Sequence, residues 1–130
     1  MPMSPDFHAR LAPKLRSITN YYGTPYHIYD EIGIRQTVRA LKSVLSDFRF
    51  NEYYAVKALP NPHVLAILRE EGCGFDCSSI AELALARQIG ASGDEIMFTS
   101  NNTSPAEFET ALAEGGCILN LDDINLLDKI

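Results

Sequence analysis

Apolar and polar residues follow two alternating patterns along this chain. Short runs of β-forming residues, such as Tyr53–Val56, alternate with longer segments in which apolar residues recur every three or four positions, such as Ile34, Val38 and Leu41. The first pattern is typical of a buried strand and the second of an amphipathic helix. We therefore expect strands at 24–30, 53–57, 74–78, 96–100 and 117–122, with a helix after each of them.

Local signals mark the starts of the expected helices. Asp30 has the position of an N-cap, and Asn61 is followed by Pro62, a residue that is well tolerated in the first turn. Ser104 and Glu107 have the spacing of a capping box. These signals predict helices that begin directly after 30, 61 and 104, in addition to one at about 80–89 and one from 123.

The regular spacing of the strands predicts the fold class. Tyr53, Phe75, Met97 and Ile118 stand near the starts of successive strands, at intervals of 22, 22 and 21 residues. Such βα alternation makes a parallel sheet, either in a doubly wound fold or in a (β/α)8 barrel. No glycine-rich nucleotide motif of the form GxGxxG or GxxxxGK[ST] follows any strand, which favours the barrel.

Composition excludes several classes of partner. The 130 residues are 46% hydrophobic and 22% charged, which suits one globular core, and a net charge of −6 with scattered basic residues argues against nucleic acid. No apolar run reaches the roughly 18 residues of a membrane span, and no signal peptide is evident, so we expect a cytoplasmic protein. The three cysteines, Cys73, Cys77 and Cys117, lack metal-site spacing and are expected to be reduced, mostly buried thiols, with no bound metal.

Lys57 is the candidate for chemistry, because it stands at the carboxyl end of an otherwise apolar strand. Alternation along the strand puts Ala55 and Lys57 on one face, and Asp76 would share the barrel interior with them. Barrel enzymes keep their active sites at this end, and a lysine in a semi-apolar pocket is a nucleophile toward carbonyl groups. A solvated lysine, or a simple Lys57–Asp76 ion pair, would explain the same spacing.

Four segments of the chain together resemble a known enzyme group. The resemblance is to the N-terminal part of the pyridoxal-phosphate-dependent decarboxylases of the alanine-racemase-like type, which include diaminopimelate decarboxylase and eukaryotic-type ornithine decarboxylases. The segments are YYAVKALPNP, GCGFDCSSIAEL, IMFTSNNTS and LNLDD. The resemblance implies the N-terminal half of a (β/α)8 TIM barrel that binds pyridoxal 5'-phosphate (PLP), with the C-terminal β-domain absent. It divides the chain into a leader, 1–23, and a truncated barrel domain, 24–130.

The resemblance also implies roles for individual residues. Lys57 matches the lysine that binds the cofactor aldehyde covalently, and Asp76 matches an acidic residue beside it. Glu82 matches a residue near the same group in the ornithine branch, although its spacing from Ser79 also fits a capping box. Ala55 completes the candidate cofactor contacts. The family often has Asn two residues after the lysine, where this chain has Leu59, and any role of that Asn is therefore in doubt here.

The implied activity is amino-acid decarboxylation. FTSNNTS and LNLDD look most like diaminopimelate decarboxylase, which converts meso-diaminopimelate to L-lysine and CO2. Ornithine/arginine-type and carboxynorspermidine-type decarboxylases of polyamine synthesis are the alternatives, as is a non-catalytic relative that serves as a binding module. A full-length homodimer is expected. The 130 residues alone are expected to be inactive, because a full barrel needs about 250.

Overall fold

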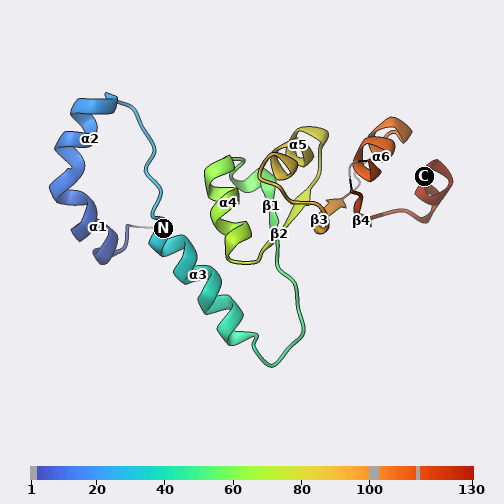
Figure 1. Cartoon of the computed structure of the whole chain (residues 1–130), viewed down its shortest axis with the longest axis horizontal. Coiled ribbons are helices and arrows are strands. Elements are labelled where there is room, and N and C mark those ends of the chain that lie inside the picture. The colour runs from blue at the N-terminus through green and yellow to red at the C-terminus, as the bar shows by residue number, and fades with distance from the viewer. Residues whose placement is uncertain (1–2, 100–102, 114) are drawn as a thin grey trace.

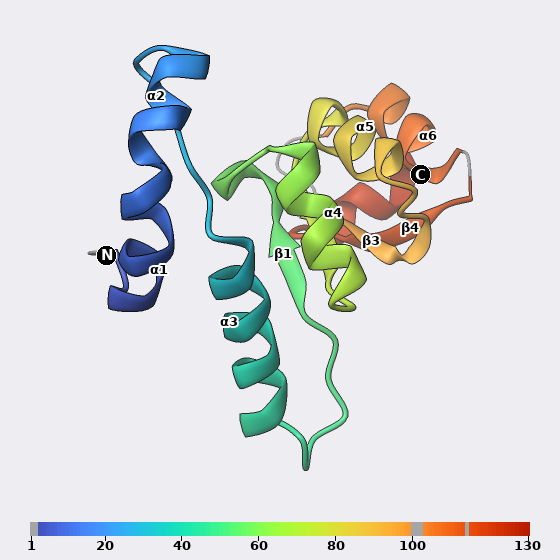
Figure 2. The same cartoon turned by 60° about the vertical axis from the view of Figure 1, so that its left-hand side comes forward.

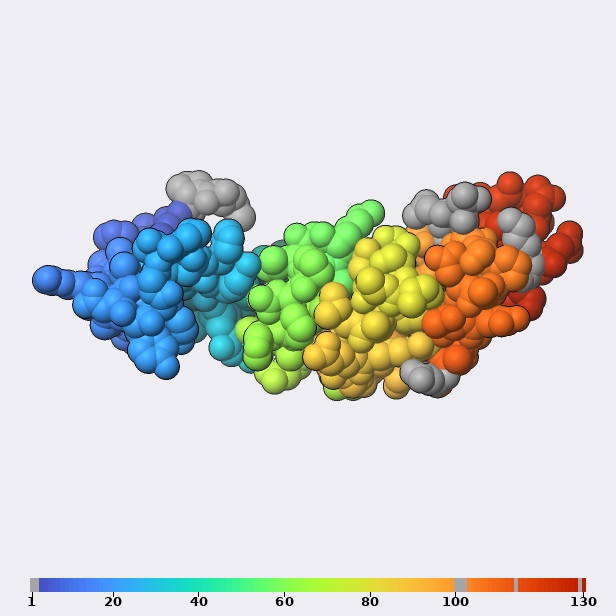
Figure 3. Space-filling model, turned by 90° about the horizontal axis from the view of Figure 1, so that it is seen from above, coloured from blue at the N-terminus to red at the C-terminus, as the bar shows by residue number. Residues whose placement is uncertain are grey.

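The computed structural model describes residues 3–99, 103–113 and 115–130. Its elements lie along the long axis of the molecule in chain order, from the N-terminal helices at one end to the last turn at the other (Figure 1, Figure 3). The described α-helices are α1 (Pro5–Leu11), α2 (Leu15–Tyr22), α3 (Glu31–Val44), α4 (Pro62–Glu70), α5 (Ile80–Gln88) and α6 (Pro105–Leu112). The 3-10 turns are η1 (Ala12–Lys14), η2 (Val56–Ala58) and η3 (Ile124–Lys129).

A parallel sheet forms the centre of the molecule. Its strands are β1 (Tyr53–Ala55), β2 (Gly74–Cys77), β3 (Gly93–Thr99) and β4 (Cys117–Asn120), and they lie side by side in that order. Each strand is followed by a helical segment, which agrees with the predicted βα repeat. The sheet is therefore arranged as consecutive strands of a barrel are.

The sheet presents two different faces. Phe75, Cys77, Ile96 and Phe98 are at most 1% exposed and pack in one core with residues of α4, α5 and α6. These helices lie along one side of the strands (Figure 2). The alternate residues of the strands are half-buried, as Asp76 is, or exposed, as Asn120 is. They form the inner face, which is the side away from the helices.

The helix starts largely follow the sequence signals. Ser104 forms the predicted capping box, because its backbone N–H donates to Glu107 and its hydroxyl accepts from the Glu107 N–H. Asn61 caps α4 by accepting from the backbone N–H groups of residues 63 and 64. Asp30 stands at the N-cap position of α3 but makes no capping hydrogen bond. Its carboxylate instead accepts from Arg10 of α1 at 2.6 Å, which ties α1 to the start of α3.

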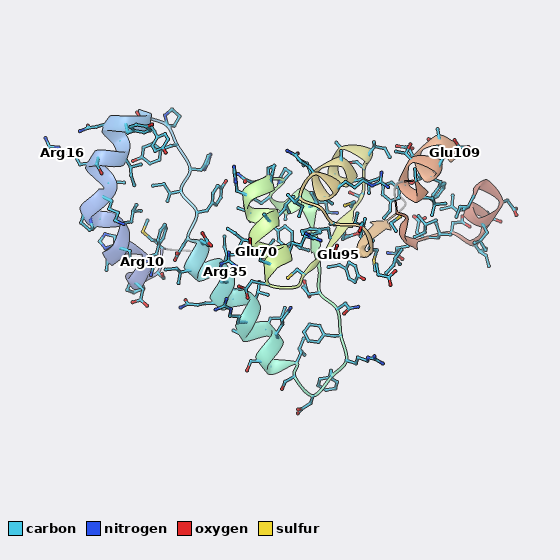
Figure 4. All side chains as sticks on the ribbon, viewed as in Figure 1. Arg10, Arg16, Arg35, Glu70, Glu95 and Glu109 are labelled. Atoms are coloured by element: carbon cyan, nitrogen blue, oxygen red, sulfur yellow. The ribbon has the colours of Figure 1, made fainter. Side chains whose placement is uncertain are left out.

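Charged side chains join α3 to α4. Arg35 of α3 donates to Glu70 at 2.6 Å and to Glu71 at 3.0 Å, and Arg39 donates to Glu71 at 2.6 Å. The labelled Arg35 and Glu70 lie between the two helices in Figure 4. The hydrogen bonds from Arg39 and then Arg35 lower the pKa of Glu71 to about 2. Lys42 adds hydrogen bonds to the backbone carbonyls of residues 71 and 72 at the end of α4.

Several predicted strands differ from the structure: β3 begins at Gly93 instead of residue 96, and β4 ends at Asn120 instead of residue 122. Residues 24–30 form no strand, because this mostly exposed segment pairs with no neighbour among the described residues, and an unpaired extended segment gains no ladder hydrogen bonds. The strand expected at 53–57 stops at Ala55, where the chain turns into η2. The segment 1–23, for which the sequence predicted no element, contains α1 and α2. The described residues include no helix of the length and apolarity that a membrane crossing requires.

Candidate active site at the carboxyl ends of the strands

Lys57 lies in the 3-10 turn η2, immediately after β1. Val56, the first residue of that turn, is completely buried, and the N–H of Leu59 donates to the Val56 carbonyl at 3.2 Å. These contacts anchor the turn, while the Lys57 side chain itself is exposed. The semi-apolar surroundings expected for this lysine are therefore not formed by the described residues. The turn presents a primary amine at the carboxyl end of the sheet.

Asp76 lies on the inner face of β2, next to the strand that leads to Lys57. Its Cα is the register partner of Ala55 in β1 and of Met97 in β3. The flanking residues Phe75 and Cys77 point into the helix-covered core, so alternation turns Asp76 to the opposite side. No hydrogen bond or ion pair joins Asp76 to Lys57 in the described part of the chain, so the simple ion pair considered from the sequence is not formed.

Two further polar residues of the inner face are linked to Asp76 by hydrogen bonds, Thr99 directly and Asn120 through Thr99. The hydroxyl of Thr99, the last residue of β3, donates to Asp76 Oδ1 at 2.5 Å. The side-chain amide of Asn120, at the end of β4, donates to Thr99 Oγ1 at 3.4 Å. The sequence reasoning missed both residues. The signal was present, because the same alternation that turns Asp76 inward also turns Thr99 and Asn120 inward.

Glu82 holds the N-terminus of α5 together. Its Oε2 accepts from the backbone N–H of Ser78 at 3.0 Å, and its backbone N–H donates to the Ser79 hydroxyl at 3.3 Å. The Ser79 hydroxyl also lies 3.2 Å from Glu82 Oε1. The N-cap of α5 is Ser79, so the Glu82 carboxylate accepts from the backbone of Ser78, the residue before the N-cap, and not from the N-cap backbone itself. The carboxylate already has partners within its own helix start.

The cysteines behind the site are free thiols. Cys73 and Cys77 are buried and Cys117 is half-buried, in agreement with the prediction of mostly buried thiols. Burial, followed by the negative charges of Glu82 and Asp76, raises the pKa of Cys77 to about 12. Burial also raises the pKa of Cys73 and Cys117. These side chains therefore act as small apolar groups under the sheet, and not as nucleophiles.

The chain matches a described protein family over most of its length. The family model described as "Pyridoxal-dependent decarboxylase, pyridoxal binding domain" matches residues 32–130. The chain belongs to this family. The match covers all four strands and leaves out the two N-terminal helices.

Individual relatives agree with this assignment. This chain is 49% identical to Protein TabA of Pseudomonas amygdali pv. tabaci over 130 residues, which are 100% of this chain and 31% of that protein. It is 38% identical to diaminopimelate decarboxylase of Methanothermobacter thermautotrophicus, over 87% of this chain and 27% of that enzyme. The chain thus spans about a third or less of the curated relatives it matches.

A solved structure has the same fold. Lysine/ornithine decarboxylase from Vibrio vulnificus, in complex with putrescine, superposes with a TM-score of 0.82 and 30% sequence identity, over 98% of this chain and 34% of that one. The four parallel strands therefore correspond to the first part of a PLP decarboxylase barrel, as the sequence predicted.

The described residues fit the aldehyde end of pyridoxal phosphate. An aldehyde needs an accessible primary amine, and Lys57 is exposed at the carboxyl end of β1. A cationic nitrogen formed there needs a nearby negative charge, and Asp76 provides a carboxylate on the adjacent strand. Only Oδ1 of that carboxylate accepts a hydrogen bond from a described residue, so Oδ2 is left available.

Proposed function

We propose that this chain is the cofactor-binding part of a PLP-dependent amino-acid decarboxylase in which Lys57 binds the cofactor aldehyde. The observation that carries the proposal is the position of Lys57, exposed at the carboxyl end of β1 and two residues after Ala55, the register partner of Asp76. Active sites of barrel enzymes lie at this end of the strands. Membership of the pyridoxal-binding family supports the same role.

The chain's own residues have distinct tasks in this proposal. When bound, pyridoxal phosphate accepts the electron pair that remains after CO2 departs. Lys57 attaches the cofactor, and its amine, once displaced by the substrate amine, can hold or deliver a proton at Nζ. The negative charge of Asp76 favours the protonated form of a nitrogen at this position by Coulomb attraction. Ala55 lies beside them on β1, and the contacts of Glu82 favour a capping role over a cofactor contact.

For the substrate we propose meso-diaminopimelate, with L-lysine and CO2 as products. The segments FTSNNTS and LNLDD, and relatives named diaminopimelate decarboxylase at 30% to 38% identity, support this choice. The similarity to a lysine/ornithine decarboxylase keeps ornithine or arginine as the second candidate. The family resemblance also leads us to propose a cytoplasmic homodimer, and a division of the chain into 1–23 and a barrel part from 24 onward.

Covalent labelling tests the cofactor assignment. The intact protein is loaded with pyridoxal phosphate, reduced with borohydride and digested, and the pyridoxyl group is located by mass spectrometry. We expect the label on Lys57 and its loss in Lys57→Ala, whereas Lys14→Ala, at an exposed position of η1, should label normally. A label on Lys14 or Lys42 would contradict the assignment. A labelled protein that releases no CO2 from any amino acid would favour the binding module.

A further inference from the structure

A chain of hydrogen bonds crosses three strands on the inner face and ends at Asp76. Asn120 Nδ2 of β4 donates to Thr99 Oγ1 of β3 at 3.4 Å, and the Thr99 hydroxyl donates to Asp76 Oδ1 of β2 at 2.5 Å. All three side chains stand near the carboxyl ends of their strands. The chain of contacts therefore reaches the site from the side opposite to Lys57, because β2 separates β1 from β3.

The direction of these hydrogen bonds follows from chemistry. An ionised carboxylate only accepts, and a threonine hydroxyl has one proton to donate. With the Asn120 amide donating to its oxygen, the Thr99 hydroxyl is left to direct its proton to Asp76. A hydrogen bond to a charged acceptor is among the stronger ones in proteins, and the 3.4 Å contact from Asn120 is weaker.

We propose that Thr99 is a positioning residue that holds the Asp76 carboxylate toward β3, so that Oδ2 is presented to the cationic nitrogen formed at Lys57. Asn120 supports Thr99 by orienting its hydroxyl. Without the hydroxyl, the Asp76 side chain can rotate, and its negative charge spends less time near that nitrogen. This inference rests on the proposed function, because it needs a cofactor bound to Lys57.

Other ionisable groups near Asp76 also bear on this interpretation. Lys57 on η2 lies beyond the register partner of Asp76, and the charges of Asp76 and of Glu82 on α5 both act on Cys77, on the same strand as Asp76. Cys77 stays neutral, because burial raises its pKa to about 12, and Glu82 is held by the helix start. The Asp76→Asn background described below then shows whether a change in the protonation of the cofactor nitrogen on substitution of Thr99 comes from Asp76.

The test compares variants of Thr99 in the intact, cofactor-loaded protein, with the pH midpoint of the cofactor absorption band as readout. Thr99→Val keeps the shape and removes the hydroxyl, whereas Thr99→Ser keeps the hydroxyl. We expect Thr99→Val to lower the midpoint by roughly half a pH unit, a threefold change in the protonation equilibrium. Thr99→Ser should stay close to wild type, and Asn120→Ala should give a smaller shift than Thr99→Val.

Two controls separate positioning from general loosening of the fold. Thr110→Val, on the exposed side of α6, removes a hydroxyl that donates to the backbone carbonyl of residue 106 at 2.8 Å, and should leave the midpoint unchanged. In an Asp76→Asn background, Thr99→Val should add no further shift, because the charge it positions is gone. Should Thr99→Val fail to fold, Thr99→Ala against Thr99→Ser makes the same comparison.

The outcomes distinguish this inference from the proposed function. If wild type takes up no pyridoxyl label on Lys57, the proposed function is wrong. If Lys57 is labelled, two results would overturn only this inference. In the first, Thr99→Val has the same pH midpoint as Thr110→Val; in the second, Thr99→Val shifts the midpoint equally with and without the Asp76 charge. Either result would mean that Thr99 does not position Asp76.

Discussion

Ala55 lies directly opposite Asp76 in the ladder between β1 and β2. Lys57 follows Ala55 by two residues. The turn η2, which carries the Lys57 amine, therefore begins next to the end of β2, the strand that carries the Asp76 carboxylate. The residues that we propose to bind and to stabilise the cofactor thus come from separate βα units, and parallel pairing alone brings them together.

Removing the charge of Asp76 should destabilise the protonated cofactor nitrogen. Asp76→Asn keeps the size of the side chain and its hydrogen bond from Thr99, so folding should be nearly unchanged. We expect a loss of about 1 to 2 kcal/mol of electrostatic stabilisation, which lowers the pH midpoint of the cofactor band by roughly one unit. Spectrophotometric titration of the intact, loaded protein measures the shift.

Salt concentration provides the control for this prediction. A screened surface interaction would give a shift that disappears at high salt, whereas a charge on the partly enclosed inner face should keep most of its effect. A mutant titration that overlays wild type at both salt concentrations would show that Asp76 does not act on the cofactor.

Substrate preference can be measured directly. We expect kcat/KM of the intact enzyme to be higher for meso-diaminopimelate than for ornithine, lysine or arginine, on the basis of FTSNNTS and LNLDD. Assays of CO2 release on the four amino acids, under the same conditions, give the comparison. A clear preference for ornithine or arginine would move the protein to the polyamine branch and leave the cofactor assignment as it is.

Glu82 should stabilise the fold more than it affects the cofactor. Glu82→Ala deprives the Ser78 N–H of its acceptor and should lower the free energy of unfolding by about 1 kcal/mol, as measured by urea denaturation. Glu82→Gln retains an acceptor oxygen but loses the charge, and should leave the cofactor midpoint near that of wild type. A midpoint shift in Glu82→Gln as large as that of Asp76→Asn would instead assign Glu82 to the cofactor.

Gly74 leaves no room for a side chain at the start of β2. A Cβ there would lie 2.7 Å from two atoms of the Tyr53 ring and 2.9 Å from the backbone carbonyl of Glu95. The Tyr53 hydroxyl is itself fixed by a hydrogen bond to the Asp94 carbonyl. Gly74→Ala should therefore destabilise the protein by about 1 to 3 kcal/mol in thermal or urea denaturation.

A second glycine serves as the control for overpacking. At Gly33 in α3, a Cβ would lie 2.9 Å from the carboxylate of Asp30, which would have to shift together with its exposed partner Arg10 at the cost of a surface ion pair. Alanine is favoured over glycine inside a helix. Gly33→Ala should thus be nearly neutral or stabilising. Equal losses at both positions would indicate that the contact with Tyr53 and Glu95 is not the cause.

The ion pairs of Arg35 and Arg39 with Glu71, which join α3 to the end of α4, should weaken in acid. The pKa of Glu71 is lowered to about 2 by its arginine partners, from an ordinary value of 4.5. Because the folded-state pKa is the lower one, the stabilisation is complete above about 4.5 and is lost as the pH falls through 2. Glu71→Gln should therefore lower the melting temperature at pH 7, and the difference from wild type should shrink toward pH 2.

Glu109 provides a matched control for this measurement. It is exposed on α6, away from α3 and α4 (Figure 4), and has no ion-pair partner among residues 3–99, 103–113 and 115–130. Glu109→Gln should leave the melting temperature unchanged across the same pH range. A constant difference between Glu71→Gln and wild type from pH 7 to pH 2 would mean that the charge of Glu71 does not stabilise the fold.

Most of the fold could be predicted from the sequence because strands and helices here carry strong local signals. The capping box of Ser104, the Asn61 cap and the apolar strand cores each specify an element through neighbouring residues. The strand expected at 24–30 does not form, because local signals alone are not sufficient for a strand. Its β-forming residues fit a strand, but a strand also needs a partner, and pairing is a property of the whole fold.

The candidate site was predictable only in part. The positions of Lys57 and Asp76 follow from strand spacing, but the chain leaves the strand at the buried Val56, where η2 begins, and the alternation of residues 53–57 carries no signal for that turn. Thr99 becomes a partner of Asp76 only when the register of β2 on β3 is known. Alternation gives the face of each residue, whereas the stagger between strands decides which side chains touch.

The strand order also determines how this chain can be assembled during synthesis. Among the described strands, β2, β3 and β4 each pair with the one made just before, and directly opposed residues such as Tyr53 and Gly74, or Met97 and Ile118, are 21 positions apart. Each βα unit can therefore dock soon after it leaves the ribosome, without waiting for a distant segment. Because each pairing is local in the sequence, we expect the strand that leads to Lys57 and the strands that carry Asp76 and Thr99 to come together in the order in which they are synthesised.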